Sequence, residues 1–271
     1  MHPGIRITLL IPLAILLGCG SSSQLVATSS STTTNLTGNW EITSHLDSSG
    51  TIADFTGALQ FNGSTVTGTF RALASNLTGN CPSFTTDLAV TGSVTTANSL
   101  SGTVNNLTLT IPISGGTATI TAILPQNPQT FTPGSLQIVG GTCSMPATAM
   151  TIVQFAPVTG TYSGTLATSG TPAISATVTA ALVQATTPNA DGLFPLTGTL
   201  TIQGPCSATL PLLPETVSGI GISFPSGSST SPASDLTGEL MTPAATSIQA
   251  FTDIYDTNCS IGALQGTLTR Q

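Results

Sequence analysis

Apolar and small polar residues alternate along most of this sequence, and the alternation constrains the fold more than any other feature. Clear runs are 107–111 (LTLTI), 118–123 (ATITAI), 174–180 (ISATVTA) and 264–268 (LQGTL). A period of two gives a β-strand one buried face and one solvated face, as in antiparallel sheets. No stretch after residue 20 keeps a helical period for three turns. We therefore predict an all-β chain.

Turn residues separate the apolar runs at short intervals. They fall at 47–50 (DSSG), 62–63 (NG), 115–116 (GG) and 189–192 (NADG). Glycine next to asparagine, aspartate or a second glycine favours the tight turns of β-hairpins. Short hairpin connections predict a meander, in which each strand pairs with the next, and closure of the meander gives a small barrel. A β-sandwich fits the same alternation and is the alternative fold.

One order of landmarks occurs twice in the sequence. The segment 36–40 (LTGNW) resembles 158–162 (VTGTY), and the segment 66–70 (VTGTF) resembles 196–200 (LTGTL). Because the order is repeated, we expect two tandem modules, each an antiparallel meander barrel of about eight strands. The two predicted modules are 35–156 and 157–271.

The first eighteen residues are typical of an export signal. Arg6 is followed by an apolar run of eleven residues, 7–17. Eleven residues of helix span about 16 Å, which is too short for a bilayer core of about 30 Å, so the run is a signal-peptide core. It ends at Leu16-Leu17-Gly18-Cys19, which resembles the lipobox of bacterial lipoproteins. That resemblance implies cleavage after residue 18 and acylation of Cys19, whose chains anchor the protein in a membrane.

Residues 19–34 are expected to form the lipidated cysteine and a flexible tether. The tether consists mostly of serine, threonine and glycine, which cannot bury a core. No aspartate follows Cys19, and by resemblance to lipoproteins of double-membrane cells this implies transport to the outer membrane. We expect a protein of the cell envelope whose one predicted membrane contact is its lipid anchor.

Four further cysteines lie two in each module. An even number of cysteines in an exported chain favours disulfides. Because the landmarks repeat, we predict the pairs Cys81–Cys143 and Cys206–Cys259, with a bridge between the modules as the alternative. Each pair closes a loop of more than fifty residues and stabilises the fold by about 3–4 kcal/mol in the chain-entropy model. A zinc site needs closely spaced cysteines, and this spacing is absent.

The charge of the chain excludes one class of partner. Charged residues make up only 5% of the sequence, and lysine is absent. After cleavage the basic residues are Arg71 and Arg270, against ten acidic residues. Nucleic-acid binding needs basic side chains that neutralise phosphates, so we expect no nucleic-acid partner.

The start of the first module, Gly38-Asn39-Trp40, resembles the glycine–any–tryptophan start of lipocalins and avidins. Together with the strand at 66–70, this resemblance covers about 35 residues. It implies a barrel in which the first aromatic ring closes one end. Avidins line their biotin site with several tryptophans, whereas Trp40 is the only tryptophan in this chain. We therefore transfer no ligand-binding residue and expect no biotin binding.

Few side chains offer catalytic or metal-binding chemistry. His45 is the only histidine after the signal peptide, so no histidine pair exists for a metal, and no Gly-x-Ser-x-Gly context supports a catalytic triad. Asp253 and Asp256 are close enough in sequence for a glycosidase-type carboxylate pair or a weak calcium site. The simpler interpretation is a polar turn beside Cys259. We predict no catalytic residue, no metal and no cofactor.

Three functional hypotheses follow from these observations. The first is a non-catalytic structural or interaction protein of the envelope. The second is a binder of a small apolar ligand inside one or both barrels, with Trp40 and Tyr162 as cavity walls instead of core aromatics. It requires an open cavity lined by small residues. The third is an enzyme, and the shortage of histidine, lysine, arginine and paired acids disfavours it.

Overall fold

The computed structural model describes most of the chain after residue 35. The described residues are 36–46, 50–75, 87–99, 102–113, 116–125, 129–140, 144–224, 233–256 and 259–271. All regular structure in these ranges is β-strand, so the predicted all-β class is confirmed. None of the described segments forms a helix able to cross a membrane. All of the described residues belong to one compact unit.

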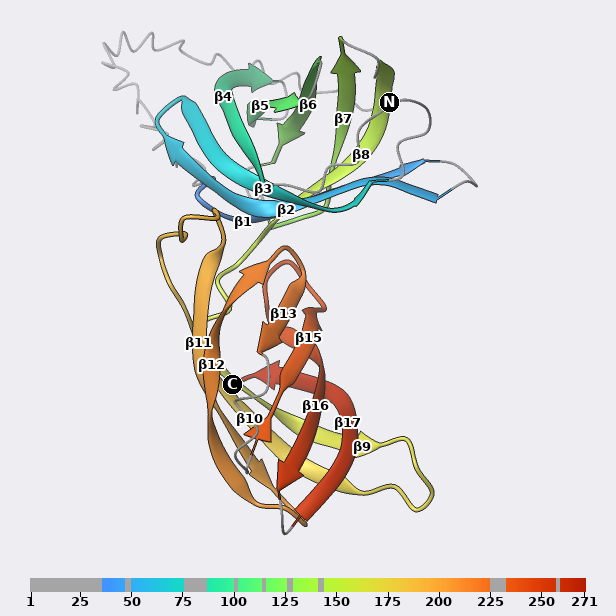
Figure 1. The fold of residues 1–271 in the computed structure, drawn as a ribbon. Helices are drawn as coiled ribbons and strands as arrows, with labels where there is room; N and C mark the ends of the chain where they lie inside the picture. The colour runs from blue at the N-terminus through green and yellow to red at the C-terminus, as the bar shows by residue number, and fades with distance from the viewer. Residues whose placement is uncertain are drawn as a thin grey trace, which may run out of the picture. The chain divides into compact units, whose positions relative to one another are not determined.

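The first eight strands form a closed antiparallel barrel, blue to green in Figure 1. Each strand pairs with the next, and β1 pairs with β8 from Asn39↔Phe155 to Thr43↔Thr151, which closes the ring. The strands are β1 (Gly38–Leu46), β2 (Gly50–Asn62), β3 (Thr65–Ser75), β4 (Asp87–Ser99), β5 (Gly102–Ile113), β6 (Gly116–Leu124), β7 (Thr132–Val139) and β8 (Met145–Phe155).

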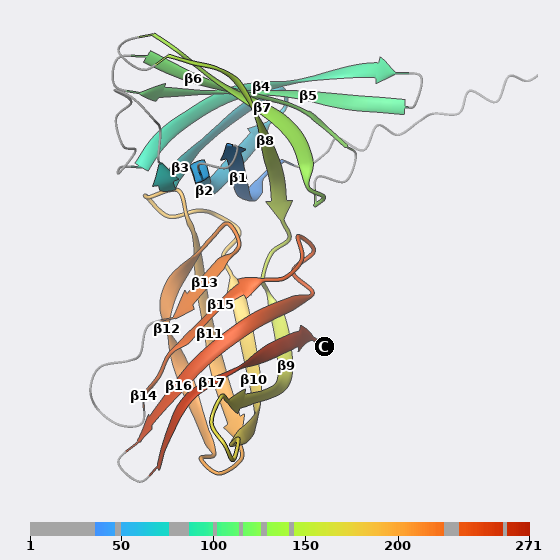
Figure 2. The same cartoon turned by 90° about the vertical axis from the view of Figure 1, so that its right-hand side faces the viewer.

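The remaining strands form a second closed barrel, yellow to red in Figure 2. The ring runs β9-β10-β11-β12-β13-β15-β16-β17, and β17 pairs with β9. The short strand β14 pairs with β16 beyond the end of β15, so β14 and β15 together fill one position. The strands are β9 (Gly160–Thr168), β10 (Ser175–Gln184), β11 (Phe194–Gln203), β12 (Ala208–Ser218), β13 (Gly221–Phe224), β14 (Ala233–Ser234), β15 (Leu236–Leu240), β16 (Ser247–Asp256) and β17 (Cys259–Arg270).

Two closed eight-stranded antiparallel barrels in tandem confirm the predicted fold class, and the β-sandwich alternative is wrong. Residues that alternate in the sequence point alternately to the inside and the outside of each barrel wall. In β10, for example, Ala176, Val178, Ala180 and Leu182 are buried, and the residues between them are more exposed. Each fully buried large aliphatic or aromatic side chain stabilises the fold by about 1.5–3 kcal/mol.

The repeated threonines have the same role at the start of each barrel. Thr37 precedes β1, and its Oγ1 accepts a hydrogen bond from the backbone N–H of Phe61 over 2.9 Å. Thr159 precedes β9, and its Oγ1 accepts from the backbone N–H of Gln184 over 3.0 Å. Both donors lie near the end of the second strand of their barrel. The sequence repeat is therefore also a repeat of local structure.

Candidate functional site

The two aromatic residues at the starts of the modules are fully buried in their barrels. Trp40 donates its indole N–H to the backbone carbonyl of Leu36 over 2.8 Å. Tyr162 donates its hydroxyl to the backbone carbonyl of Ala245 over 2.8 Å. Burial raises the pKa of the Tyr162 hydroxyl, and the positive charge of Arg270 opposes this in part. The polar atoms of both rings are thus directed at the protein backbone.

The predicted carboxylate pair is only partly described. Asp253 is half-buried in β16, and its backbone N–H donates to Asp235 Oδ1 over 2.9 Å. Asp256 pairs with Cys259 in the backbone register where β16 passes into β17, and its side chain lies outside the described residues. The described residues contain no group of three or more histidine, cysteine or acidic side chains that could hold a metal.

The other predicted site residues lie mostly outside the described part. Cys19, Cys81 and Cys143 are not among the described residues, and the side chain of Cys259 is not described. The same holds for the side chain of His45, whose backbone belongs to β1. Cys206 is buried and disulfide-bonded. The two disulfide pairings and the lipidation of Cys19 stay predictions.

Large apolar side chains are packed within both barrels. Each barrel has its own cluster of buried residues, dominated by leucine, isoleucine and valine with a few aromatics. In the first barrel, the largest fully buried side chains are Trp40, Phe55 and Phe70. In the second barrel, they are Tyr162 and Phe224. An enclosed ligand site needs unfilled space, whereas these side chains are buried against one another.

A turn of the second barrel docks on the outer face of the first. Asn39 in β1 donates from Nδ2 to the carbonyl of Gly219 over 2.7 Å, and the N–H of Gly219 donates to Asn39 Oδ1 over 2.8 Å. The next residue of this turn, Ile220, donates its N–H to Glu41 Oε2 over 2.8 Å. One amide and one carboxylate of β1 therefore bind three backbone groups of the β12–β13 turn. No pattern in the sequence indicates this joint.

A second turn and apolar packing extend the joint. The carbonyl of Gly192, before β11, accepts from the backbone N–H of Ala58 in β2 over 3.0 Å. The hydroxyls of Thr56 and Ser218 lie 2.6 Å apart. Ala58 belongs to the same buried cluster as the core of the second barrel, together with Val153 in β8. The joint thus combines direct hydrogen bonds with apolar packing of Ala58 and Val153, on the wall of the first barrel, against the core of the second.

Burial at the joint changes the acidity of Glu41. Desolvation is the largest effect on this side chain and raises the pKa of its carboxyl above the ordinary value of 4.5. The negative charges of Asp54 and Glu239 raise it further, whereas hydrogen bonds from Ile220 N–H and the Thr43 hydroxyl lower it. The net result is a raised pKa, because the loss of water outweighs the hydrogen bonds.

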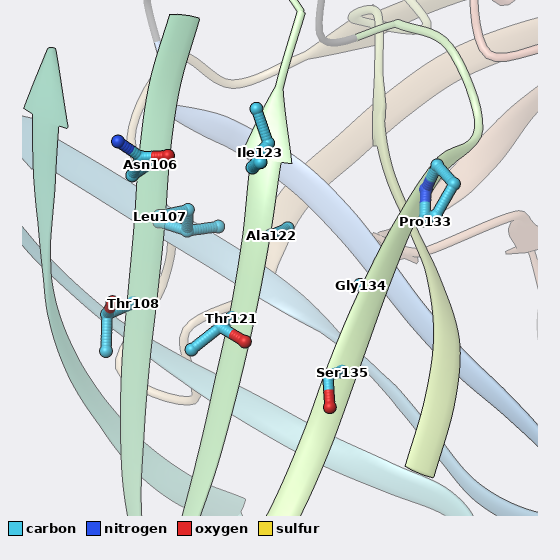
Figure 3. A pocket seen from close by; sticks show the side chains of 9 residues that line it. All are labelled: Asn106, Leu107, Thr108, Thr121, Ala122, Ile123, Pro133, Gly134 and Ser135. Atoms are coloured by element: carbon cyan, nitrogen blue, oxygen red, sulfur yellow. The ribbon is translucent and has the colours of Figure 1, made fainter. Parts of the chain in front are cut away.

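The first barrel also has two open pockets where β6 and β7 separate. The recorded pairing of β6 with β7 ends at Ala122↔Gly134. The next residue of β7 toward this end is Pro133, which has no N–H to donate to β6. One pocket of about 450 Å³ spans β5, β6 and β7, and Figure 3 shows the two strands parting between Ile123 and Pro133. A neighbouring pocket of about 350 Å³ shares these two residues.

The rim of these pockets exposes large apolar side chains. Ile123 and Phe131 each expose 62% of their surface. The second pocket is also lined by Val104 and Leu124. We name this site the β6–β7 notch: its exposed rim is Ile123, Phe131 and Pro133, and Val104 and Leu124 line its pocket. The sequence signal for it was Pro133 at the start of a strand, which the sequence analysis did not use.

Comparison with known proteins identifies no family for this chain. No protein-family model and no curated protein sequence matches the chain. One similar solved structure is a DUF3598-family protein of unknown function from Nostoc punctiforme, with 11% identity, a TM-score of 0.29, and coverage of 87% of this chain and 96% of that one. Another is a double mutant of transferrin binding protein B from Haemophilus parasuis, with 12% identity, a TM-score of 0.22, and coverage of 85% and 64%. Resemblances this distant carry no information on function.

Proposed function

We propose that the chain is a non-catalytic, lipid-anchored protein of the cell envelope that acts through its outer surface. The observation that supports this most is the packing of both barrels with large apolar side chains. A barrel filled in this way leaves its outer face, its turns and its tether as the parts that meet other molecules. The anchor itself is supported by the sequence Leu16-Leu17-Gly18-Cys19.

The joint between the barrels supports a structural or interaction role. Three backbone groups at Gly219 and Ile220 are bound by side chains of β1, and Ala58 and Val153 of the first barrel pack against the core of the second. A pair of barrels joined in this way presents one extended surface to a partner. The binder of a small apolar ligand inside a barrel is the weaker hypothesis, since its cavity would have to displace Trp40, Phe55 or Tyr162.

Native mass spectrometry of the protein released from its own envelope, without reducing agent, tests this proposal. We expect the mass of a chain cleaved after residue 18, carrying acyl chains and two disulfides, with no further molecule bound. The Cys19→Ser variant is the control, because it removes the acylated thiol and should yield no acylated mass. A stoichiometric small molecule on the wild-type protein would contradict the filled-barrel proposal. A wild-type mass without acyl chains would contradict the anchor.

A further inference from the structure

The β6–β7 notch lies at the end of the first barrel where the chain enters it. In an antiparallel meander, every odd-numbered strand begins at the same end, so β7 begins at the end where β1 begins. Phe131 immediately precedes β7, and Leu36 lies two residues before the first residue of β1. The notch and the start of the described chain are therefore at one end of the barrel.

The predicted anchor limits how far this end can lie from a membrane. Cys19 precedes Leu36 by 17 residues, and a fully extended chain of that length spans at most about 60 Å. The barrel end that holds Leu36 is thus the end tied most closely to the anchor, within about 60 Å of it. The joint with the second barrel uses β1, β2 and β8 and leaves Ile123 and Phe131 exposed.

The chemistry of the notch fits a lipid surface. The chain carries ten acidic residues, but no charged side chain lines either pocket of the notch. An anionic membrane surface repels an acidic face, so an uncharged face is the one that can approach such a surface closely. Transfer of exposed phenylalanine and isoleucine side chains from water to the boundary between headgroups and acyl chains lowers the free energy.

We propose that the β6–β7 notch is a membrane-contacting face, with Ile123 and Phe131 entering the surface of the bilayer that holds the anchor. This inference rests on the proposed lipid anchor, which supplies the high local concentration of lipid. The anchor holds the protein to the membrane, and the notch sets which end of the first barrel faces it.

Two tryptophan reporters of matched exposure test the orientation. Phe131→Trp places a reporter at the notch, and Val139→Trp places one at the opposite end of the same strand, where Val139 exposes 57% of its surface. Trp40 is the only native tryptophan and is fully buried, so it contributes a constant background. Both substitutions are at exposed positions, and circular dichroism of each variant checks that the fold is retained.

The measurement is tryptophan quenching by vesicles of phosphatidylcholine with brominated acyl chains, compared with unbrominated vesicles. Each full-length variant is purified in acylated form from its own envelope and reconstituted. We expect strong quenching in F131W and quenching no greater than that of the wild type in V139W. Equal quenching in the two variants, or none in F131W, overturns the proposal. The absence of quenching in F131W is also the result expected if a protein partner, and not the membrane, covers the notch.

The test separates failure of the notch from failure of the anchor. The acyl mass is measured on the same samples, so an acylated F131W that is not quenched contradicts the notch alone. If no acyl chain is present, the lipid-anchor proposal fails. The chain after residue 18 is then held on the same vesicles through an N-terminal histidine tag and a nickel-chelating lipid. In that arrangement as well, stronger quenching in F131W than in V139W supports the notch proposal, and equal quenching contradicts it.

Discussion

Asn39 and Gly219 lie 180 residues apart in sequence and are joined by two hydrogen bonds. The side-chain amide of Asn39 donates to the carbonyl of Gly219 over 2.7 Å and accepts from its N–H over 2.8 Å. This reciprocal pair resembles one step of a β-ladder, but a side chain takes the place of one strand. Both groups are buried, so neither has water as an alternative partner.

Asn39→Ala is expected to destabilise the protein through this pair. The substitution leaves the N–H and the carbonyl of Gly219 without a partner in a buried site, which costs about 2–3 kcal/mol in the free energy of unfolding. Urea denaturation followed by circular dichroism measures the change. Gln60→Ala in β2 is the control, because Gln60 is exposed and its loss should change stability by less than about 0.5 kcal/mol. Equal changes in the free energy of unfolding for Asn39→Ala and Gln60→Ala would show that the hydrogen bonds between Asn39 and Gly219 contribute no stability.

Gly219→Ala is expected to weaken the joint more than the same change at another turn glycine. Gly219 has φ of 57°, and a Cβ there would lie 2.5 Å from Thr56 Cγ2 and 2.6 Å from Glu41 Oε2. Gly63 has φ of 64°, and nothing lies within 4 Å of a Cβ at that position. Both substitutions carry the strain of a left-handed residue, about 1–2 kcal/mol, so their difference isolates the contact with the first barrel. Thermal unfolding compares them.

Comparable losses in Gly219→Ala and Gly63→Ala would contradict a tightly packed joint. Limited proteolysis gives an independent reading, since a loosened joint should expose the segment between the barrels, 156–159, to cleavage. We expect faster cleavage there in Gly219→Ala than in the wild type, and no acceleration in Gly63→Ala.

The raised pKa of Glu41 predicts a specific dependence of stability on pH. A carboxyl whose pKa is higher in the folded protein than in the unfolded chain favours folding when it is protonated. Its contribution is therefore fully present below the ordinary pKa of 4.5 and is lost as the pH rises through the raised folded value. Glu41→Gln keeps an acceptor for the N–H of Ile220 and removes this titration.

The stability of Glu41→Gln relative to the wild type should therefore increase as the pH rises from about 4 toward 7. Denaturation of both proteins at a series of pH values measures the difference in the free energy of unfolding. A difference that stays constant over this range would contradict the raised pKa. A difference that decreases would mean that the ionised carboxylate stabilises the joint.

Cys206 is expected to pair with Cys259 in the second barrel. Cys206 is buried and disulfide-bonded, and the sequence repeat selects Cys259 as its partner. Peptide mapping without reduction should recover the two cysteines in one linked fragment. Cys206→Ser should lower the free energy of unfolding by about 3–4 kcal/mol. A linked fragment that joins Cys206 to Cys81 or Cys143 would refute the predicted pairing.

The alternation of residues predicted the β-class and the barrels because each strand has to bury one face. Period two at 107–111 and 174–180 is a local signal, and short turns limit which strands pair. The repeat of 36–40 at 158–162 could also be recognised in the sequence. It has a structural counterpart, because Thr37 and Thr159 accept equivalent hydrogen bonds in the two barrels. Closure, however, depends on pairing of β1 with β8, which no local pattern encodes.

The joint and the notch could not be predicted from local patterns. The turn at 189–192 was predicted as a turn, but its docking on Ala58 depends on how two separate barrels meet. Asn39 was noted only as part of an aromatic motif, and its buried partner lies 180 residues away. The notch depends on where β6 and β7 stop pairing, and Pro133 marks that point only once the register is known.

The fluorescence of Trp40 tests the central claim, that the barrels are filled, most directly. Trp40 is the only tryptophan of the chain and is fully buried in the first barrel, so its emission reports the interior of that barrel alone. We expect blue-shifted emission that acrylamide quenches weakly and that fatty acids or other small apolar molecules leave unchanged. Emission that changes saturably with such a molecule would show an interior that opens to a ligand and would contradict the account.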